Sequence, residues 1–184
     1  MNWKKQKSRC STFCKMTGLK FHLKHSVFVL LLSLLGLNSC MTSPYYQKSV
    51  TVPSYTWNYN FQPSFRFEIS DTSSYYNLYF LIRHTDAYPY GNIWLNIYTK
   101  EPGEKVFQQS RIEIPLAETG GKWLGRGMNE IWEQRMPITR NDAAMIFKKK
   151  GTYEIKLEQN MRVNPLPEVL QVGLRVEKIG VPKK

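Results

Sequence analysis

The sequence predicts an all-β protein, an antiparallel β-sandwich of about seven or eight strands with an immunoglobulin-like or a jelly-roll arrangement. Short segments alternate between apolar and polar residues, which is the period of a strand with one buried face. Turn signals rich in Gly, Pro, Asp and Ser separate these segments. Aromatic residues, which favour strands, make up 14% of the chain.

The predicted strands differ in how many of their faces are buried. Two of them, residues 78–84 and 93–99, are apolar on both faces and should be central in their sheets. Pro115 cannot donate a ladder hydrogen bond, so its strand should lie at a sheet edge or end there. One short helix is expected at residues 141–147. The strands with one wet face are expected at residues 65–69, 111–116, 152–158 and 170–178.

A targeting signal precedes the predicted domain. Lys20 and Lys24 flank an apolar run at residues 27–37, and Asn38-Ser39-Cys40 follows it. A basic flank, a short apolar core and a small residue before the cleavage point form a secretory signal, and a Cys directly after that residue makes it a lipoprotein signal. The run is about half as long as the roughly 20 residues of a bilayer-spanning helix, which argues against an uncleaved membrane anchor.

Lipidation at Cys40 divides the chain into four parts. Met16 gives a signal of ordinary length, so we expect residues 1–15 to be an extension from a misassigned start codon. Residues 16–39 form the signal peptide, residues 40–54 a polar tether, and residues 55–184 the β-sandwich domain. Cys40 is then the only cysteine of the mature chain, so no disulfide framework is expected.

The charge of the chain resides largely in its targeting segment. The whole sequence has a formal net charge of +12, with 26 basic and 14 acidic residues. Residues 1–39 contain seven of the basic and none of the acidic residues, so the remainder, with 19 against 14, carries only +5. The basic residues there are scattered apart from Lys148, Lys149 and Lys150, which argues against a nucleic-acid-binding surface.

No catalytic or metal-binding pattern is visible in the sequence. His84 is the only histidine after the signal, and a lone His at a strand end is usually structural. Nucleophile elbows, phosphate loops and paired metal ligands are missing from the sequence. We therefore expect no enzyme activity and no cofactor.

An ordered series of motifs resembles the GldH family of gliding-motility lipoproteins from the Bacteroidetes. The resemblance covers roughly residues 52–179 and includes the lipoprotein signal. It departs from the family in the additional N-terminus and in Asn38, where a smaller or aliphatic residue is commoner. The motifs, in chain order, are Tyr76-Asn77-Leu78-Tyr79, Arg83, Tyr88-Pro89-Tyr90, Asn92, Gly121-Lys122-Trp123-Leu124-Gly125, Gly151-Thr152-Tyr153, Gln159, Met161-Arg162 and Val172-Gly173-Leu174-Arg175.

The resemblance implies an outer-membrane lipoprotein of the gliding machinery, a system linked to type IX secretion, with acyl chains such as palmitate on Cys40. It implies no catalytic residues. The partners would be the membrane and other envelope or gliding-machinery proteins, without nucleic acid. Surface-exported lipoproteins of these bacteria tend to carry acidic residues after the acylated Cys. This chain has none before Glu68, so we expect the domain to face the periplasm.

Aromatic and Arg side chains in two loops are the expected contact surface for a protein partner. Tyr88, Tyr90, Trp123 and Arg126 are of the types enriched at binding hot spots. An equally open alternative is that these residues fold back and plug the ends of the sandwich. A second functional hypothesis is a carbohydrate-binding β-sandwich, which would need two or three coplanar aromatic rings on one open face.

Overall fold

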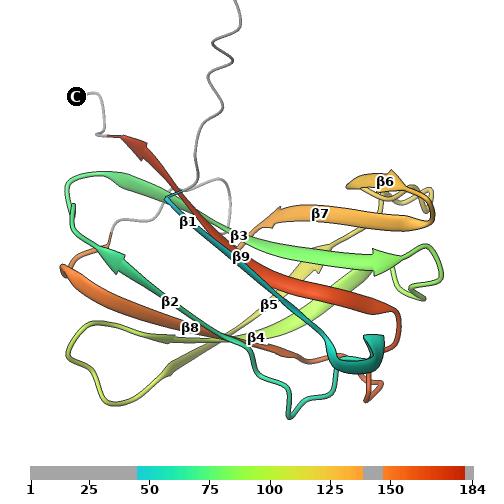
Figure 1. The fold of residues 1–184 in the computed structure, drawn as a ribbon, viewed down its shortest axis with the longest axis horizontal. Coiled ribbons are helices and arrows are strands. Elements are labelled where there is room, and N and C mark those ends of the chain that lie inside the picture. The colour runs from blue at the N-terminus through green and yellow to red at the C-terminus, as the bar shows by residue number, and fades with distance from the viewer. Residues whose placement is uncertain (1–44, 139–146, 181–184) are drawn as a thin grey trace, which may run out of the picture. The chain divides into compact units, whose positions relative to one another are not determined.

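The computed structural model describes residues 45–138 and 147–180, which form two antiparallel sheets packed face to face (Figure 1). The five-stranded sheet has the order β1-β9-β3-β7-β6, and the four-stranded sheet has the order β2-β8-β4-β5. The elements are β1 (Tyr46–Thr51), the 3₁₀ turn η1 (Pro53–Tyr55), β2 (Ser64–Ile69), β3 (Tyr75–Thr85), β4 (Asn92–Lys100), β5 (Gln108–Pro115), β6 (Arg126–Met128), β7 (Ile131–Pro137), β8 (Gly151–Gln159) and β9 (Val169–Gly180).

The strand pairings are nested along the chain. The first strand pairs with the last, β2 pairs with β8, β3 pairs with β7, and β4 pairs with β5. This nested pairing arises when one long antiparallel hairpin is rolled up so that its strands alternate between two sheets. A sandwich with this strand order is a jelly roll. The predicted β-sandwich is confirmed, and the topology selects the jelly roll over the immunoglobulin-like alternative.

Each predicted strand coincides with an observed one, and only the strand predicted at residues 111–116 extends past it, by Leu116. The two strands predicted to be central, β3 and β4, each pair on both sides, β3 with β7 and β9 and β4 with β5 and β8. The strand predicted at an edge is β5, which lies at the end of its sheet and finishes at Pro115. The amphipathic pattern therefore located these strands and their depth in the sheets correctly.

The expected tether was wrong over its second half. Tyr46–Thr51 form β1, which pairs with β9 along its whole length, and Val52 after it is fully buried. Tyr46 and Val50 pack against the core on one face of β1, but Lys48 lies between them and hides the alternation in the sequence. The domain therefore starts at or before β1 rather than at residue 55. The described part has nine strands, more than the expected seven or eight, and β1, the three-residue β6 and β7 lie outside the ranges predicted as strands.

The approach of β1 to β9 depends on a glycine. A Cβ atom at Gly173 would lie 2.5 Å from the Ser49 Oγ and 2.6 Å from the Lys48 carbonyl oxygen. Those distances are too short for any side chain, so Gly173 allows the first strand to dock against the last. This contact joins the N-terminal end of the domain to the middle of its larger sheet.

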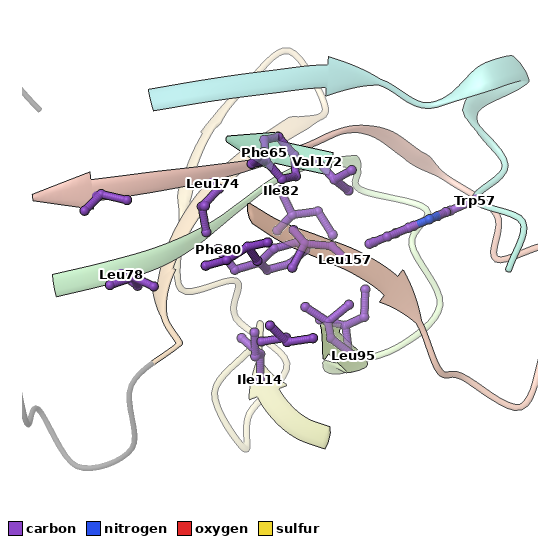
Figure 2. Packing of buried hydrophobic residues seen from close by; sticks show 14 of the residues in the cluster. Trp57, Phe65, Leu78, Phe80, Ile82, Leu95, Ile114, Leu157, Val172 and Leu174 are labelled. Atoms are coloured by element: carbon purple, nitrogen blue, oxygen red, sulfur yellow. The ribbon is translucent and has the colours of Figure 1, made fainter. Parts of the chain in front are cut away.

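The core lies between the two sheets (Figure 2). Leu78, Phe80 and Ile82 from β3 point inward at every second residue, as does Leu174 from β9, and all are at most 3% exposed. Trp57 closes one end and stacks on Phe80 with 6.4 Å between ring centroids. The facing residues of the four-stranded sheet in Figure 2 are Phe65, Leu95, Ile114 and Leu157.

The expected helix at residues 141–147 lies almost entirely outside the described residues. Only Phe147 is described, and it is buried against Tyr153 and Phe67, with ring centroids 4.6 and 5.7 Å away. The segments predicted as extension and signal, residues 1–39, and Cys40 also lie outside the described range.

Leu174→Ala should lower the free energy of unfolding by about 2–5 kcal/mol, because the side chain is fully buried between the sheets. Leu124→Ala is the matched control, since Leu124 is 44% exposed, and it should change stability by less than about 0.5 kcal/mol. Urea titrations of both variants provide the measurement. A loss for Leu174→Ala as small as that expected for Leu124→Ala would mean that the inward face of β9 is misassigned.

Candidate functional site

Four loops meet at one end of the sandwich, opposite the end where β1 begins. They connect β1 to β2, β3 to β4, β5 to β6, and β8 to β9. Two of them carry the predicted contact residues, Tyr88 and Tyr90 in the loop after β3 and Trp123 in the segment before β6. The β5–β6 segment is held in place by a bridge between Ala117 and Trp123 and by the Leu124 N–H, which donates to the Leu116 carbonyl at 2.9 Å.

An aromatic cluster fills the space under this end of the larger sheet. We use that name for His84, Tyr88, Tyr90, Trp123 and Trp132. The Trp123 ring meets the His84 ring edge-on at 4.5 Å and lies 6.5 Å from the Trp132 ring, while Tyr88 lies 5.2 Å from His84 and 5.8 Å from Tyr90. Three of the four predicted contact residues therefore gather here.

Tyr88 does not form part of an exposed contact surface. Its side chain is only 3% exposed, and its hydroxyl donates to the Asn92 carbonyl oxygen at 3.1 Å. Burial raises the pKa of this phenol well above its ordinary value. The alternative of a residue folded back to plug the sandwich holds for Tyr88, whereas Tyr90 and Trp123 remain partly exposed at the edge of the cluster.

His84 is a buried, neutral member of the cluster. Its Nδ1 lies 2.8 Å from the Thr85 carbonyl oxygen, which can only accept, so Nδ1 carries the proton. Its Nε2 then accepts from the Gln134 side-chain amide at 2.8 Å. Burial lowers the pKa of the His84 imidazole below its ordinary value. Both ring nitrogens of His84 are thus occupied by hydrogen bonds within the protein, as expected for a structural histidine.

Asp86 connects the two loops of the cluster. One of its carboxylate oxygens accepts hydrogen bonds from both the Trp123 and the Trp132 indole N–H, at 2.9 and 3.1 Å. Its own backbone N–H donates to the Glu130 carbonyl at 2.8 Å. The exposed Asp86 carboxylate therefore holds two tryptophans from different segments in position. The sequence around Asp86 does not reveal this role.

Arg126 lies on the other face of the sheet. In the strand register Arg126 is opposite Glu133, and Glu133 is opposite Arg83. Gly127, the next residue after Arg126, is opposite Trp132 of the aromatic cluster. Because side chains of neighbouring strand residues point to opposite faces, Arg126 is separated from the three aromatic residues predicted with it. The expected contact surface therefore divides into two parts.

The outer face of the larger sheet carries a hollow of about 700 Å³, whose lining includes Arg126. We call it the arginine hollow and define it by Arg83, Arg126, Arg135 and Arg175, which all line it. The strands β3, β6, β7 and β9 each supply one of these residues. Three of the four arginines were not predicted as site residues, because their convergence depends on strand pairing.

A tight hairpin forms the outer wall of the arginine hollow. Asn129 and Glu130 connect β6 to β7 with positive φ angles of 50° and 64°, the conformation of a two-residue turn that suits the twist of paired strands. A Cβ atom at Gly127 would lie 2.9 Å from the Trp132 ring, so only a glycine allows β6 to pack this closely. The hairpin thus joins the wall of the hollow to the aromatic cluster beneath it.

The aromatic residues give little basis for a glycan platform. Within residues 45–138 and 147–180, the stacked ring pairs are Trp57 with Phe80 and Phe67 with Tyr153, and both pairs involve buried core rings. Trp94, on the outer face of β4, has the Arg111 guanidinium over its ring at 4.3 Å.

No group of three or more metal-ligating side chains occurs in the described part of the chain. Nor do the described ranges contain a helix of the length and apolarity needed to cross a bilayer. The recognisable surface features of the described domain are the arginine hollow and the aromatic cluster, both carried by an antiparallel β-sandwich.

The chain belongs to the GldH lipoprotein family, whose profile matches residues 44–176. It is 26% identical over 160 residues to a "Gliding motility lipoprotein GldH homolog" of Christiangramia forsetii, covering 83% of this chain and 95% of the relative. It is 25% identical over 157 residues to the "Gliding motility lipoprotein GldH" of Flavobacterium johnsoniae, covering 82% and 94%. These matches confirm the family resemblance seen in the sequence motifs.

Among solved structures, the crystal structure of a carbohydrate-binding module specific for non-crystalline cellulose is similar, with a TM-score of 0.40 and 13% identity. The alignment covers 73% of each chain. At this TM-score the likeness does not bear on function.

Asp86→Ala should lower stability by about 1–2 kcal/mol, because two indole N–H groups lose their shared acceptor. Asp86→Asn is the matched control, since it keeps an acceptor oxygen at the same position and should lose less. Urea unfolding followed by tryptophan fluorescence measures both. Identical stability of the Ala variant and the wild type would show that Asp86 does not hold the cluster together.

The burial of His84 predicts a specific pH dependence of stability. Its folded pKa is lowered, so the unfolded chain, with a histidine pKa of about 6.5, binds the proton more readily. Stability should therefore fall as the pH drops below about 6.5 and level off below the folded pKa, by at most about 1.4 kcal/mol per pH unit. His84→Phe should remove this slope between about pH 7.5 and 5.5, and a slope unchanged in that variant would contradict the assignment.

Proposed function

We propose that the protein is a non-catalytic, lipid-anchored envelope protein that serves a gliding-motility machinery, linked to type IX secretion, as a binding or assembly factor. The match to the GldH lipoprotein family over residues 44–176 carries this proposal, and two gliding-motility lipoproteins are similar over almost their whole length. A rigid sandwich with an open arginine-lined surface suits binding better than chemistry.

The anchor in this proposal is a lipid on Cys40 that inserts into the outer membrane. Each buried methylene of an acyl chain contributes about 0.8 kcal/mol, so several chains on one cysteine hold the protein stably on a membrane. Tyr45 is the first described residue, and its hydroxyl donates to the Glu68 carbonyl at 2.8 Å. Five residue steps from Cys40 span at most about 18 Å, so the anchor would keep the domain close to the bilayer.

The domain would hang from the inner face of the outer membrane into the periplasm. The residues after Cys40 carry no acidic side chain before Glu68, so an acidic export signal is missing from the sequence. Protease added to intact cells should leave the protein whole, whereas permeabilised cells should lose it. Digestion on intact cells would contradict the periplasmic orientation.

Partner contact would use the exposed parts of the predicted surface. Arg126 on the hairpin and the partly exposed Tyr90 and Trp123 are available, whereas Tyr88 supports them from inside. Since the lipid confines the domain to one membrane surface, a weak contact there gains effective concentration. A binding or assembly role therefore needs no large interface.

Cys40→Ala should abolish acylation and leave the unprocessed precursor, because the thiol of Cys40 is the acceptor. Thr42→Ala, two residues after Cys40, is the matched control and should be acylated normally. Incorporation of labelled palmitate, followed by gel analysis, measures both variants. Labelling that persists in Cys40→Ala would contradict the lipoprotein assignment.

Deletion of the gene from its own host tests the role in motility and secretion. The deletion strain should spread less on a surface or release fewer type IX cargo proteins, and the wild-type gene should restore both. A version that starts at Met16 should restore them as well if residues 1–15 are dispensable. A deletion strain with normal spreading and normal secretion would overturn the proposed function.

A further inference from the structure

The arginine hollow has an excess of positive charge that the described residues do not neutralise. Its lining contains the four arginines and a single carboxylate, that of Glu133. On the outer face of the smaller sheet, by contrast, charges are paired: the Glu154 carboxylate lies 2.8 Å from the Lys100 ammonium and 3.4 Å from the Arg66 guanidinium.

The four guanidinium groups differ in how far they are already satisfied. Arg135 and Arg175 share the Glu177 carboxylate, with Arg135 at 3.0 Å, and Arg175 also donates to the Gln47 side chain at 2.7 Å. Arg83 donates only a long hydrogen bond of 3.4 Å to Gln171, and its buried Nε has no partner among the described residues. Arg126 forms no ion pair within the described ranges.

Two exposed apolar side chains also line the hollow. Met128 and Leu124 line it with exposures of 78% and 44%, which are high for large hydrophobic side chains. A volume of about 700 Å³ lies within the range of sites that enclose several chemical groups. The complementary ligand thus combines oxyanions, which arginines bind through paired N–H groups, with adjacent apolar groups.

The edge of the sheet at this site is open. β6 is the last strand of its sheet and has no neighbour on its outer side within the described part of the chain. Met128 and Ile131 close the two-residue hairpin, so the next pair, Gly127 with Trp132, is a non-hydrogen-bonded pair. The Gly127 N–H and C=O therefore point away from β7, where an extended chain can pair with them.

We propose that the arginine hollow binds an extended acidic segment of a protein partner, with its carboxylates on Arg83 and Arg126 and its apolar side chains on Leu124 and Met128. This inference rests on the proposed function of a binding or assembly factor and assigns its contact site. Arg126 and Arg135 are exposed, whereas Arg83 and Arg175 are half-buried on the sheet, so a protruding peptide reaches all four and a flat bilayer surface does not. β6, which lines the hollow, is the edge of the sheet opposite β1 (Figure 1).

The test uses the full lipoprotein in detergent micelles, with a short alternating Glu-Leu peptide as the probe and an alternating Gln-Leu peptide as its uncharged control. The Glu-Leu peptide should bind, and its affinity should fall as salt is raised, because the contact is between exposed charges. Arg126→Gln and Arg83→Gln should each weaken binding by about tenfold. Arg162→Gln makes the same change in net charge at an exposed loop residue outside the hollow and should leave binding unchanged.

Thermal unfolding of each variant keeps the test valid, because Arg126 is exposed and its substitution should leave the melting temperature unchanged. The proposal would be overturned if the Glu-Leu peptide failed to bind at low salt. It would also be overturned if Arg162→Gln weakened peptide binding as much as Arg126→Gln and Arg83→Gln do. Vesicles of phosphatidylglycerol and of phosphatidylcholine form the second arm. Binding to anionic vesicles that requires Arg83 and Arg126 would instead assign the hollow to a lipid headgroup.

The two proposals fail in different measurements. Peptide binding that depends on the arginines, together with normal motility and secretion in the deletion strain, would leave the acidic-segment site standing and remove the proposed function. Defective motility together with no peptide binding would retain the proposed function and remove the site.

Discussion

The strict alternation of side chains along β3 is the constraint on which the rest of the structure depends. This strand is paired on both sides, and every second residue from Tyr76 to His84 is buried while the residues between them face outward. Its inward side chains supply the centre of the core and the histidine of the aromatic cluster, and its outward ones supply Arg83 of the arginine hollow. A slip of one residue would exchange these faces, so core and candidate site are specified together.

The sequence was sufficient for the fold class because burial patterns are local. Alternation located β2, β8 and β9, and apolar character on both faces identified β3 and β4 as central. The pairing of strands far apart in the chain, which distinguishes a jelly roll from an immunoglobulin-like sandwich, leaves no local pattern. β1 was missed for a related reason: it contributes only Tyr46 and Val50 to the core, and its place depends on the room that Gly173 leaves in β9.

The candidate site was predictable only in part. Residue types drew attention to Tyr90, Trp123 and Arg126, but the sequence did not show that Arg126 lies on the opposite face of the sheet from the aromatic residues. Register decides that question, and register follows from the two-residue hairpin at Asn129 and Glu130. The link through Asp86 and the convergence of four arginines depend on three-dimensional contacts between separate segments, so neither leaves a motif in the chain.

The proposed partner site lies at the β6 edge of the larger sheet, opposite β1. Its most direct test is a photoreactive amino acid at Met128, on the rim of the hollow, compared with one at Val106, in the turn between β4 and β5; both positions are highly exposed, at 78% and 76%. Illumination of intact envelopes should crosslink a protein at Met128 but not at Val106, and Arg126→Gln should remove that crosslink. The same adducts at both positions, or lipid adducts alone at Met128, would contradict the account.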